Sequence, residues 1–576
     1  MALLDACNPD LLDRIPLSAR NVLDVGCGTG ATLAAYRARN QAVLLYGIEP
    51  DPGAAQIAAS RLDHVLCGLL EPAVPPFGTT LFDCILLGDS LQRMADPWRA
   101  LALLARQLTP GGLMLLCVPN LEHWSFTHAV LTGSWSYQEE GLMDRAHLRW
   151  FTLASMEDML RRAGLACLDV SARIFDAPAA AAFTSKMAPA LHALGLDPAE
   201  YLHRATPLQH VWRAMPEASV QPAMTVVSTM LEPVGGVSDV RVLQPLQALG
   251  REPGIVSHVI APGETPQIKA EGPRIFIFHR PCLVEPSGIE TVADLLAQDF
   301  VVICEFDDHP DHLPVLQRPD VVNFHAVHAI QTTTPALASV LAQRNPHVAV
   351  FPNAIDEARP ARNFTDPNRL TLFFGGLNRE QDWPDLMPAL NAVLAEAGER
   401  LFVRVVSDHR FFTALATPHK HFTPLCDYRT YLDLLATSDI SLMPLRDTAF
   451  NRCKSDLKHL EASAARVLSL ASPVVYDSVI ESGRNGLLFT DGDHLQSQLR
   501  AVLANPSWAQ SLAEAARHET LATRSLAEQT LARRNWYRQL WQDRATLTAS
   551  LYARVPALRQ AVEHRKACQG AFSISK

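Results

Sequence analysis

Residues 21–30, with the sequence NVLDVGCGTG, decide the fold of the first third of this 576-residue chain. The apolar part predicts a buried strand, and Gly26, Gly28 and Gly30 predict a turn in which the backbone can approach a ligand closely. A second apolar run ends in Glu49. An acidic residue at the end of the second strand of a βαβ unit can accept hydrogen bonds from ribose hydroxyls. Strand, turn and acid together predict a nucleoside site, whereas the turn alone would fit a plain strand-to-helix connection.

The composition limits the classes of function. The length predicts three or four domains, and 48% hydrophobic and 19% charged residues allow substantial cores. The net charge of -10 argues against general nucleic-acid binding. No uncharged apolar run reaches about 18 residues, so we expect no membrane span, while peripheral attachment to a membrane complex stays open. The start has no signal-peptide pattern, and eleven cysteines without a CxxC pair predict a reduced, cytoplasmic protein.

The region 1–175 alternates strand and helix patterns. This alternation predicts a parallel sheet covered by helices, with a ligand at the carboxyl ends of the strands. The expected strands are 21–26, 44–49, 64–68, 82–88 and 112–118.

About 150 residues of this region resemble class I S-adenosylmethionine-dependent methyltransferases, through VLDVGCGTG, then GIEPD at 47–51, then the segment 82–120. The resemblance implies a Rossmann-like sheet and an S-adenosylmethionine site. It implies that Asp89, after the fourth strand, lies where cofactor and acceptor meet. The residues implied to bind the cofactor are Asp24, Gly26, Gly28, Gly30 and Glu49.

Two details test this resemblance. A dehydrogenase would space its glycines as G-x-G-x-x-G, whereas this chain has G-x-G-x-G with an aspartate inside the strand. Many methyltransferases of this class have an acidic residue just after the third strand, near the adenine amine. Residues 68–71 read GLLE here, so that contact is shifted or missing.

The segment 144–152, DRAHLRWFT, resembles methyltransferases encoded with bacterial glycan genes. His147 is a candidate general base for a sugar hydroxyl, because an unperturbed histidine titrates near neutral pH. The alternative is that Asp144 and His147 fasten a loop before the helix that starts near Thr152. Methyl transfer depends mainly on positioning, so an essential base is not required.

The rest of the chain predicts a helical linker and two further α/β units. Residues 176–221 are alanine-rich with helical spacing and several prolines, and we expect a linker there. A second strand–helix series, which breaks near 355–368, then predicts two lobes over 222–365 and 366–550. We expect a strand at 474–476, a closing helix from Ser507 to about Arg544, and a tail over 551–576.

The segment 450–461, FNRCKSDLKHLE, carries the strongest chemistry of this half. Ser455 is a candidate N-cap, which places Lys454 just before a helix and Lys458 and Glu461 on one face of it. A helix N-terminus with two lysines suits a pyrophosphate, and a carboxylate one turn further can bind ribose. The alternative is a surface helix with ordinary ion pairs.

This segment, with SDISLMPL at 438–445, SPVV at 472–475 and NGLLF at 485–489, resembles the carboxy-terminal lobe of group-1 (GT-B) glycosyltransferases. The resemblance implies that Lys454 and Lys458 bind the diphosphate of a nucleotide-sugar and that Glu461 binds its ribose. Gly375 and Gly376 fit the entry to this lobe. Gly235 and Gly236, in PVGGVSDVR at 233–241, resemble the first loop of the other lobe. Relatives often have an acid where this chain has Cys453, which leaves the donor-sugar contacts open.

The segment 304–312, CEFDDHPDH, has the residue types of a metal site. Asp307, Asp308, His309 and His312 offer mixed oxygen and nitrogen ligands. Two-lobed glycosyltransferases, however, neutralise phosphate with lysines and a helix end. An acidic loop after a strand explains the same residues, so we expect no metal.

The sequence therefore predicts an α/β enzyme in which a Rossmann-like methyltransferase precedes a two-lobed GT-B glycosyltransferase. We expect both to act on one glycan or lipid-linked glycan, such as a bacterial surface polysaccharide. The alternatives are a single-activity enzyme with the other half degenerate, favoured by GLLE at 68–71 and by Cys453, and a non-catalytic scaffold.

Overall fold

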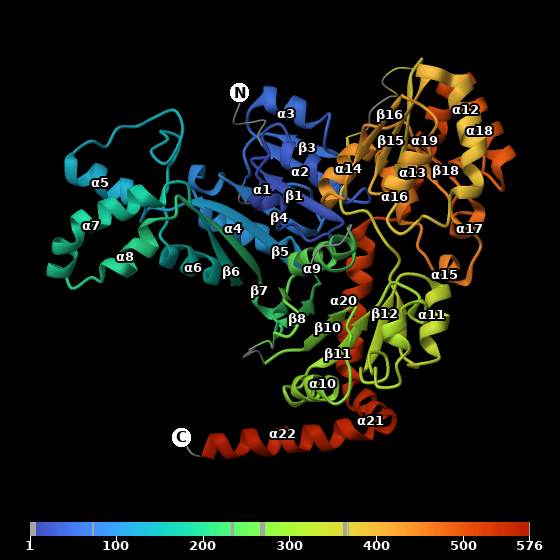
Figure 1. Cartoon of the computed structure of the whole chain (residues 1–576). Helices are drawn as coiled ribbons and strands as arrows, with labels where there is room; N and C mark the ends of the chain where they lie inside the picture. Colours follow the sequence, from blue (N-terminus) through green and yellow to red (C-terminus); the bar gives the residue numbers. More distant parts are fainter. Residues whose placement is uncertain are drawn as a thin grey trace. The chain divides into compact units, whose positions relative to one another are not determined.

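The computed structural model describes residues 7–71, 74–231, 236–264, 266, 271–360, 364, 366 and 368–574 (Figure 1). The chain divides into two compact units. The first comprises Met1–Pro222 with Arg251–Gly254, and the second comprises Ala223–Gly250 with Ile255–Lys576. None of the helices within the described ranges is long and apolar enough to cross a membrane.

The first unit contains a seven-stranded sheet in the order β3-β2-β1-β4-β5-β7-β6. Its strands are β1 (Asn21–Val25), β2 (Leu44–Glu49), β3 (His64–Cys67), β4 (Phe82–Gly88), β5 (Leu108–Pro119), β6 (Leu165–Arg173) and β7 (Gln209–Pro216). The first five strands pair in parallel, as predicted, and β7 runs antiparallel to both of its neighbours. The strand order reverses between β1 and β4, so their carboxyl ends form the switch point at which open α/β sheets bind ligands.

Helices connect these strands, and all of them except α2 begin at a residue whose side chain accepts a backbone N–H. They are α1 (Pro9–Leu12), α2 (Ala31–Arg37), α3 (Pro52–Ala58), α4 (Pro97–Arg106), α5 (Trp124–Thr132), α6 (Leu153–Arg162), α7 (Ala177–Ala193) and α8 (Pro198–Ala205). In α3 and α4 an aspartate N-cap accepts a backbone N–H and proline follows as the first helical residue. Helix α6 begins after Thr152, as the sequence indicates.

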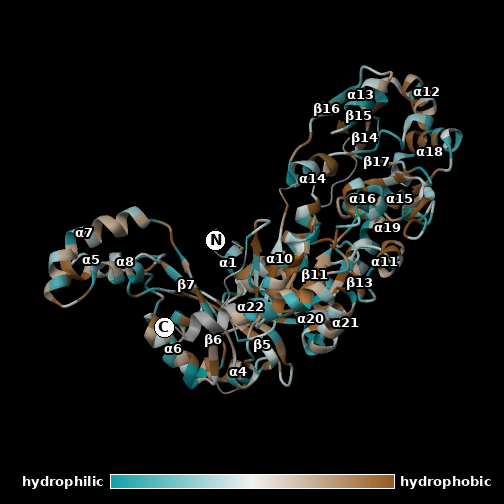
Figure 2. Ribbon diagram, turned by 60° about the horizontal axis from the view of Figure 1, so that its bottom comes forward, coloured by the Kyte–Doolittle hydropathy of each residue, from teal (hydrophilic) through white to brown (hydrophobic). Residues whose placement is uncertain are grey.

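The prediction that residues 176–221 form a helical linker is wrong for their last part. Helices α7 and α8 do occupy the start of the segment, packed on each other and on α5, and both views show these three helices together (Figure 1, Figure 2). The chain then enters the sheet as β7, between β5 and β6. Trp212 of β7 is 1% exposed and belongs to the core of the unit, so this strand is integral to the fold.

The second unit contains two six-stranded sheets whose strand pairs are all parallel, as the two-lobed prediction requires. The first sheet has the order β13-β12-β11-β10-β8-β9 and the second the order β16-β15-β14-β17-β18-β19. Their strands are β8 (Met224–Thr229), β9 (Ile255–Ile260), β10 (Arg274–His279), β11 (Val301–Glu305), β12 (Ala329–Thr332), β13 (Val348–Val350), β14 (Leu370–Gly375), β15 (Leu401–Val406), β16 (Lys420–Thr423), β17 (Ile440–Met443), β18 (Leu468–Ala471) and β19 (Leu487–Leu488).

The expected strand at 474–476 is wrong, because the strand of that region is β18 and Val475 has a φ of 72° within the short turn α17. The helices of this unit are α9 (Gln244–Arg251), α10 (Ser287–Ala297), α11 (Pro335–Ala342), α12 (Met387–Ala397), α13 (His409–Ala414), α14 (Tyr428–Ala436), α15 (Ala449–Arg452), α16 (Leu457–Ala464), α17 (Pro473–Tyr476), α18 (Gly492–Ala504), α19 (Pro506–Thr523), α20 (Leu526–Gln542), α21 (Arg544–Arg554) and α22 (Pro556–Ile574).

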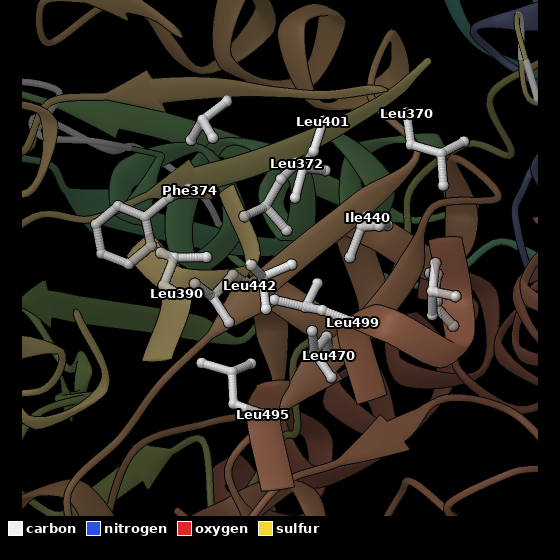
Figure 3. Packing of buried hydrophobic residues seen from close by; sticks show 14 of the residues in the cluster. Leu370, Leu372, Phe374, Leu390, Leu401, Ile440, Leu442, Leu470, Leu495 and Leu499 are labelled. Carbon is white, nitrogen blue, oxygen red and sulfur yellow. The ribbon is translucent and has the colours of Figure 1, made fainter. Parts of the chain in front are cut away.

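The chain closes the second unit by returning from one sheet to the other. Helices α18 and α19 pack on the second sheet, whose core is drawn in Figure 3. Helix α20 packs on the first sheet through Tyr537 and Leu540. The single closing helix predicted from Ser507 to about Arg544 is instead two helices, α19 and α20, with a break at Arg524 and Ser525. The expected tail over 551–576 is wrong, because Leu551, Val555 and Leu558 of α21 and α22 are buried in the core beside α10.

A buried ion pair ties the first sheet together. Arg241 donates through Nε and Nη2 to Oε1 of Glu305 at 2.9 and 2.8 Å, and the two side chains are 2% and 1% exposed. Arg241 also donates to the carbonyl of Phe351 and to Asn353, and Gln331 donates to the other Glu305 oxygen. Both the guanidinium of Arg241 and the carboxylate of Glu305 therefore have close hydrogen-bond partners, which a buried ion pair needs.

Removing one member of this pair should destabilise the second unit strongly. Glu305→Ala leaves Arg241 buried without its carboxylate, and we expect a loss of about 3–5 kcal/mol in urea unfolding followed by fluorescence. Glu396→Ala breaks an exposed pair with Arg500 on the second sheet and should cost less than about 1 kcal/mol. Equal costs for the two substitutions would contradict this view of the buried pair.

Candidate active sites

The glycine turn after β1 has the backbone that its sequence predicts. Gly26, Gly28 and Gly30 have φ values of 80°, 55° and 77°, a region that residues with a Cβ rarely adopt. A Cβ on Gly26 would lie 2.9 Å from the Cβ of Ser90, which follows β4. The turn therefore lies against the end of β4, at the switch point of the sheet.

Glu49 is held on this turn. Its side chain is 5% exposed, Oε2 accepts the backbone N–H of Gly28 at 2.8 Å, and Oε1 accepts that of Asp51 at 2.9 Å. A carboxylate has about four acceptor positions, so two stay available for ribose hydroxyls. The buried hydroxyl oxygen of Ser90 has no hydrogen-bond partner in the described part of the chain, which also fits a polar ligand at this edge.

Asp24 completes this group from within β1. Its side chain is 7% exposed, and burial, followed by the charge of Glu49, raises its pKa to about 7. The structure therefore brings together all five residues that the sequence placed at the cofactor: the three glycines, Asp24 and Glu49. Glu71, in the segment that departs from the methyltransferase pattern, is exposed.

Asp89 lies directly after β4 with a φ of 54°. Its Oδ1 accepts the side-chain amide of Gln209 at 2.7 Å and that of Gln92 at 3.4 Å. Burial raises the pKa of Asp89, and the charge of Arg173 opposes this rise. Gln209 and Arg173 could not be predicted from the sequence, because they belong to strands far from Asp89 in the chain and nothing local marks them.

His147 is 6% exposed, and its Nδ1 lies 3.3 Å from the carbonyl oxygen of Leu142. Burial lowers its pKa, so the imidazole is neutral at physiological pH. His147 and Asp89 each influence the pKa of the other, which places them within electrostatic reach. Asp144 instead accepts hydrogen bonds from Arg93 at 2.7 Å and from the backbone of Ala146, as expected of a residue that fastens the loop.

In the second unit, helix α16 begins at Leu457, and its N-cap is Asp456 rather than the predicted Ser455. The carboxylate of Asp456 binds Arg524 at 2.6 and 3.0 Å, and the hydroxyl of Ser455 accepts the amide of Asn353 at 2.8 Å. Ser455 is therefore used to contact another segment, which a local capping rule does not foresee.

Both lysines of this segment lie at the start of α16. The Nζ of Lys454 donates to Asp308 at 2.9 Å, and burial lowers the pKa of this lysine. Lys458 donates to the carbonyl of Gly375 at the end of β14. Burial, followed by the charge of Arg379, lowers the pKa of Lys458 to about 7. Within the described ranges no carboxylate lies at ion-pair distance from Lys458, and the charges of Glu461 and Asp382 only partly oppose the lowering of its pKa.

Glu461 lies one turn further along α16 and is 5% exposed. Burial raises its pKa to about 7, opposed by hydrogen bonds from Tyr428 and Tyr431, of which the Tyr428 bond measures 2.8 Å. Two of the predicted glycines lie against these tyrosine rings. A Cβ on Gly236 would lie 2.4 Å from the ring of Tyr428, and a Cβ on Gly375 would lie 2.6 Å from the ring of Tyr431. Gly235 lies outside the described residues.

Gly376 and Arg379 follow β14. A Cβ on Gly376 would meet the ring of Phe374 at 2.8 Å. Arg379, which the sequence analysis missed, donates to Asp382 and Asn451 at 3.3 Å each, and its charge lowers the pKa of both Lys454 and Lys458. Three cations thus gather at the start of α16. Arg379 could have been found from its position just after the Gly375-Gly376 pair.

The acidic loop after β11 is engaged in ion pairs. Asp307 binds Arg280 at 2.5 Å, and Asp308 binds Lys454. His309 accepts the backbone N–H of Asp311 and caps a short 3-10 turn. Across the described residues there is no group of three or more His, Cys, Asp or Glu side chains with metal-binding geometry. Cys453 is 6% exposed and belongs to the core of the first sheet.

Comparison with known proteins found one family match in each unit. Residues 5–170 match the family model described as a methyltransferase domain, and residues 390–534 match the model described as glycosyl transferase-like. The ubiquinone biosynthesis O-methyltransferase of Cereibacter sphaeroides is 28% identical over 178 residues, which cover 29% of this chain and 68% of that protein. The trans-aconitate 2-methyltransferase of Methylobacterium nodulans is 34% identical over 120 residues, or 20% and 44% of the two chains.

Comparison with solved structures also found similar chains. The Anabaena protein HepE in complex with UDP and glucose aligns with a TM-score of 0.43 at 12% identity, covering 55% of this chain and all of that chain. A SAM-dependent methyltransferase from Thermotoga maritima aligns with a TM-score of 0.24 at 21% identity, covering 34% and 82% of the two chains.

The parallel sheets and the two family matches agree with the predicted architecture, a Rossmann-like unit followed by a two-lobed GT-B unit. The chain therefore contains a methyltransferase domain, matched over residues 5–170 of its first unit, and a glycosyl transferase-like domain, matched over residues 390–534 of its second.

Proposed function

We propose that this protein is a bifunctional enzyme that transfers a methyl group from S-adenosylmethionine and a sugar from a nucleotide-diphosphate donor. We propose that both reactions modify one glycan, as in the synthesis of a bacterial surface polysaccharide. One observation carries the proposal: each unit holds a buried glutamate beside a backbone turn or helix start suited to a nucleoside ligand, Glu49 in the first and Glu461 in the second.

In the first unit, the turn at residues 26–30 would carry the methionine part of S-adenosylmethionine, and Asp24 and Glu49 would hold its polar groups. The bound cofactor supplies an electrophilic methyl group on a sulfonium. The protein has to align the acceptor hydroxyl with it and exclude water. His147 and Asp89 lie within electrostatic reach of each other, and His147 in its neutral form can accept the hydroxyl proton. The related protein named as an O-methyltransferase supports an oxygen acceptor.

In the second unit, we propose that Lys454, Lys458 and Arg379 bind the diphosphate and that Glu461 binds the ribose, with Gly235, Gly236, Gly375 and Gly376 lining the donor. Transfer breaks the bond between the anomeric carbon and the diphosphate oxygen, and negative charge develops on the leaving group. Cations fixed at the start of a helix stabilise that charge. Lys458 would gain its full charge as the diphosphate enters, since an anion raises the pKa that burial has lowered.

The acceptor is proposed to be a glycan or a lipid-linked glycan, met at the cytoplasmic face of a membrane. Exposed apolar side chains near α5 and α7, among them Leu131, Phe175 and Leu194, support contact with a lipid part. A single-activity enzyme is the second candidate. It is favoured by Cys453, because a buried cysteine stands where relatives often have an acid that faces the donor sugar.

Binding of S-adenosylhomocysteine should depend on Glu49. Glu49→Gln keeps the shape of the side chain but weakens its hydrogen bonds to hydroxyls, so we expect an affinity loss of about tenfold or more in isothermal titration calorimetry. Asp63→Asn alters a carboxylate that binds Arg37 beside β3, and should leave the affinity unchanged. Wild-type affinity in the Glu49→Gln protein would argue against the cofactor site.

Binding of nucleoside diphosphates should weaken as the pH rises. Lys458 is charged below its pKa of about 7 and neutral above it, so each pH unit above 7 should lower the affinity by up to about tenfold until the pKa of the bound state is reached. We would titrate UDP, GDP, ADP and dTDP from pH 6 to 9. Lys458→Met should bind weakly with a flatter profile, whereas Lys420→Met, a change at the start of β16, should behave like wild type. A wild-type profile in Lys458→Met would refute this role.

A further inference from the structure

Two side chains from β6 and β7, the last strands of the seven-stranded sheet, reach the end of β4. Gln209 is the first residue of β7 and Arg173 the last residue of β6, and the two are paired in register. Because β7 runs antiparallel to β5, it starts where β4 and β5 end. The antiparallel strand therefore delivers Gln209 to the same edge of the sheet as Asp89.

A chain of hydrogen bonds runs from Arg173 as the first donor, through Gln209, to Asp89 as the final acceptor. Arg173 Nη1 donates to Oε1 of Gln209 at 2.5 Å, and Nε2 of Gln209 donates to Oδ1 of Asp89 at 2.7 Å. Asp10 of α1 binds the Nε of Arg173 at 2.7 Å and holds the guanidinium in place. A guanidinium can only donate, so it fixes the amide oxygen of Gln209 toward itself and the amide NH₂ toward Asp89.

This direction leaves one oxygen of Asp89 available. Both amides, from Gln209 and Gln92, donate to Oδ1. Oδ2 accepts no hydrogen bond from the described residues. An ionised carboxylate with one oxygen fixed and the other open can accept a hydrogen bond from an incoming hydroxyl.

We infer that Gln209 and Arg173 are positioning residues that fix the orientation of Asp89 and hold its Oδ2 open toward the methyl acceptor. The inference rests on the proposed function, which places the acceptor at this edge of the sheet. It extends that function by giving the strand β7, which the sequence suggested was a linker, a role in the site.

The charges around Asp89 agree with this role. Burial raises its pKa, and the charge of Arg173 is the largest opposing influence, followed by the hydrogen bond from Gln92 and the charges of Arg93 and His147. Cys117 of β5 also lies within reach, and its own pKa is raised to about 12, so it stays neutral. Without Gln209 the burial of Asp89 would be less well compensated, and its pKa should rise further.

A double-mutant cycle on the full-length protein tests the inference without any substrate. Gln209→Leu, Asp89→Asn and the double variant are compared with wild type by thermal unfolding between pH 4.5 and 8. A raised folded-state pKa lowers stability above that pKa and has little effect where Asp89 is protonated in both states. The loss caused by Gln209→Leu should therefore grow with pH, by about 3–5 °C in Tm for each unit of pKa rise.

In the Asp89→Asn background the loss should be the same at every pH. Gln107→Leu, a buried glutamine of the same unit that contacts Gly78, serves as the matched control and should show no pH-dependent loss in either background. If Gln209→Leu does not fold, Arg173→Gln is used in its place to measure the pH-dependent interaction with Asp89. A pH-independent loss from both variants, or a pH-dependent loss that remains in the Asp89→Asn background, would overturn the inference. S-adenosylhomocysteine binding, measured separately, reports on the proposed function itself.

Discussion

A buried carboxylate held by fixed donors is the constraint on which both sites depend. Glu49 and Glu461 are each 5% exposed. The first is bound by two backbone N–H groups and the second by the tyrosines of α14. Burying such a group is costly unless hydrogen bonds compensate it, so its surroundings are fixed in advance of any ligand. The glycine turn and the start of α16 are arranged around these two acids.

Compensation differs between the two units. In the first unit, Asp24 and Glu49 are close together, and burial raises the pKa of Asp24 to about 7, so the site limits its negative charge in the free protein. In the second unit, burial lowers the pKa of Lys458 and raises that of Glu461, each to about 7. Both groups are thus poised to change protonation when a charged ligand enters. The pair Lys454–Asp308 links this site to the acidic loop that follows β11.

Local sequence predicted the parts of the fold and of the sites that arise from adjacent residues. The strand, turn and acid around Gly26 are near one another in the chain, and so are Lys454, Lys458 and Glu461. Partners that come from distant strands could not be predicted: Gln209 and Arg173 reach Asp89 only because β7 enters the sheet between β5 and β6. Ser455 looked like a cap but binds Asn353. Residues 551–576 were predicted as a tail because their apolar side chains are buried only by packing beside α10, which is distant in the chain.

The central claim is that one chain has two independent nucleoside sites. Native mass spectrometry of the full-length protein, with S-adenosylhomocysteine and each of UDP, GDP, ADP and dTDP, tests it most directly. We expect a ternary complex with one S-adenosylhomocysteine and one nucleoside diphosphate on a single chain, each binding with the same affinity whether or not the other is present. A protein that binds only one of the two ligand classes, or binds them in competition, would contradict it.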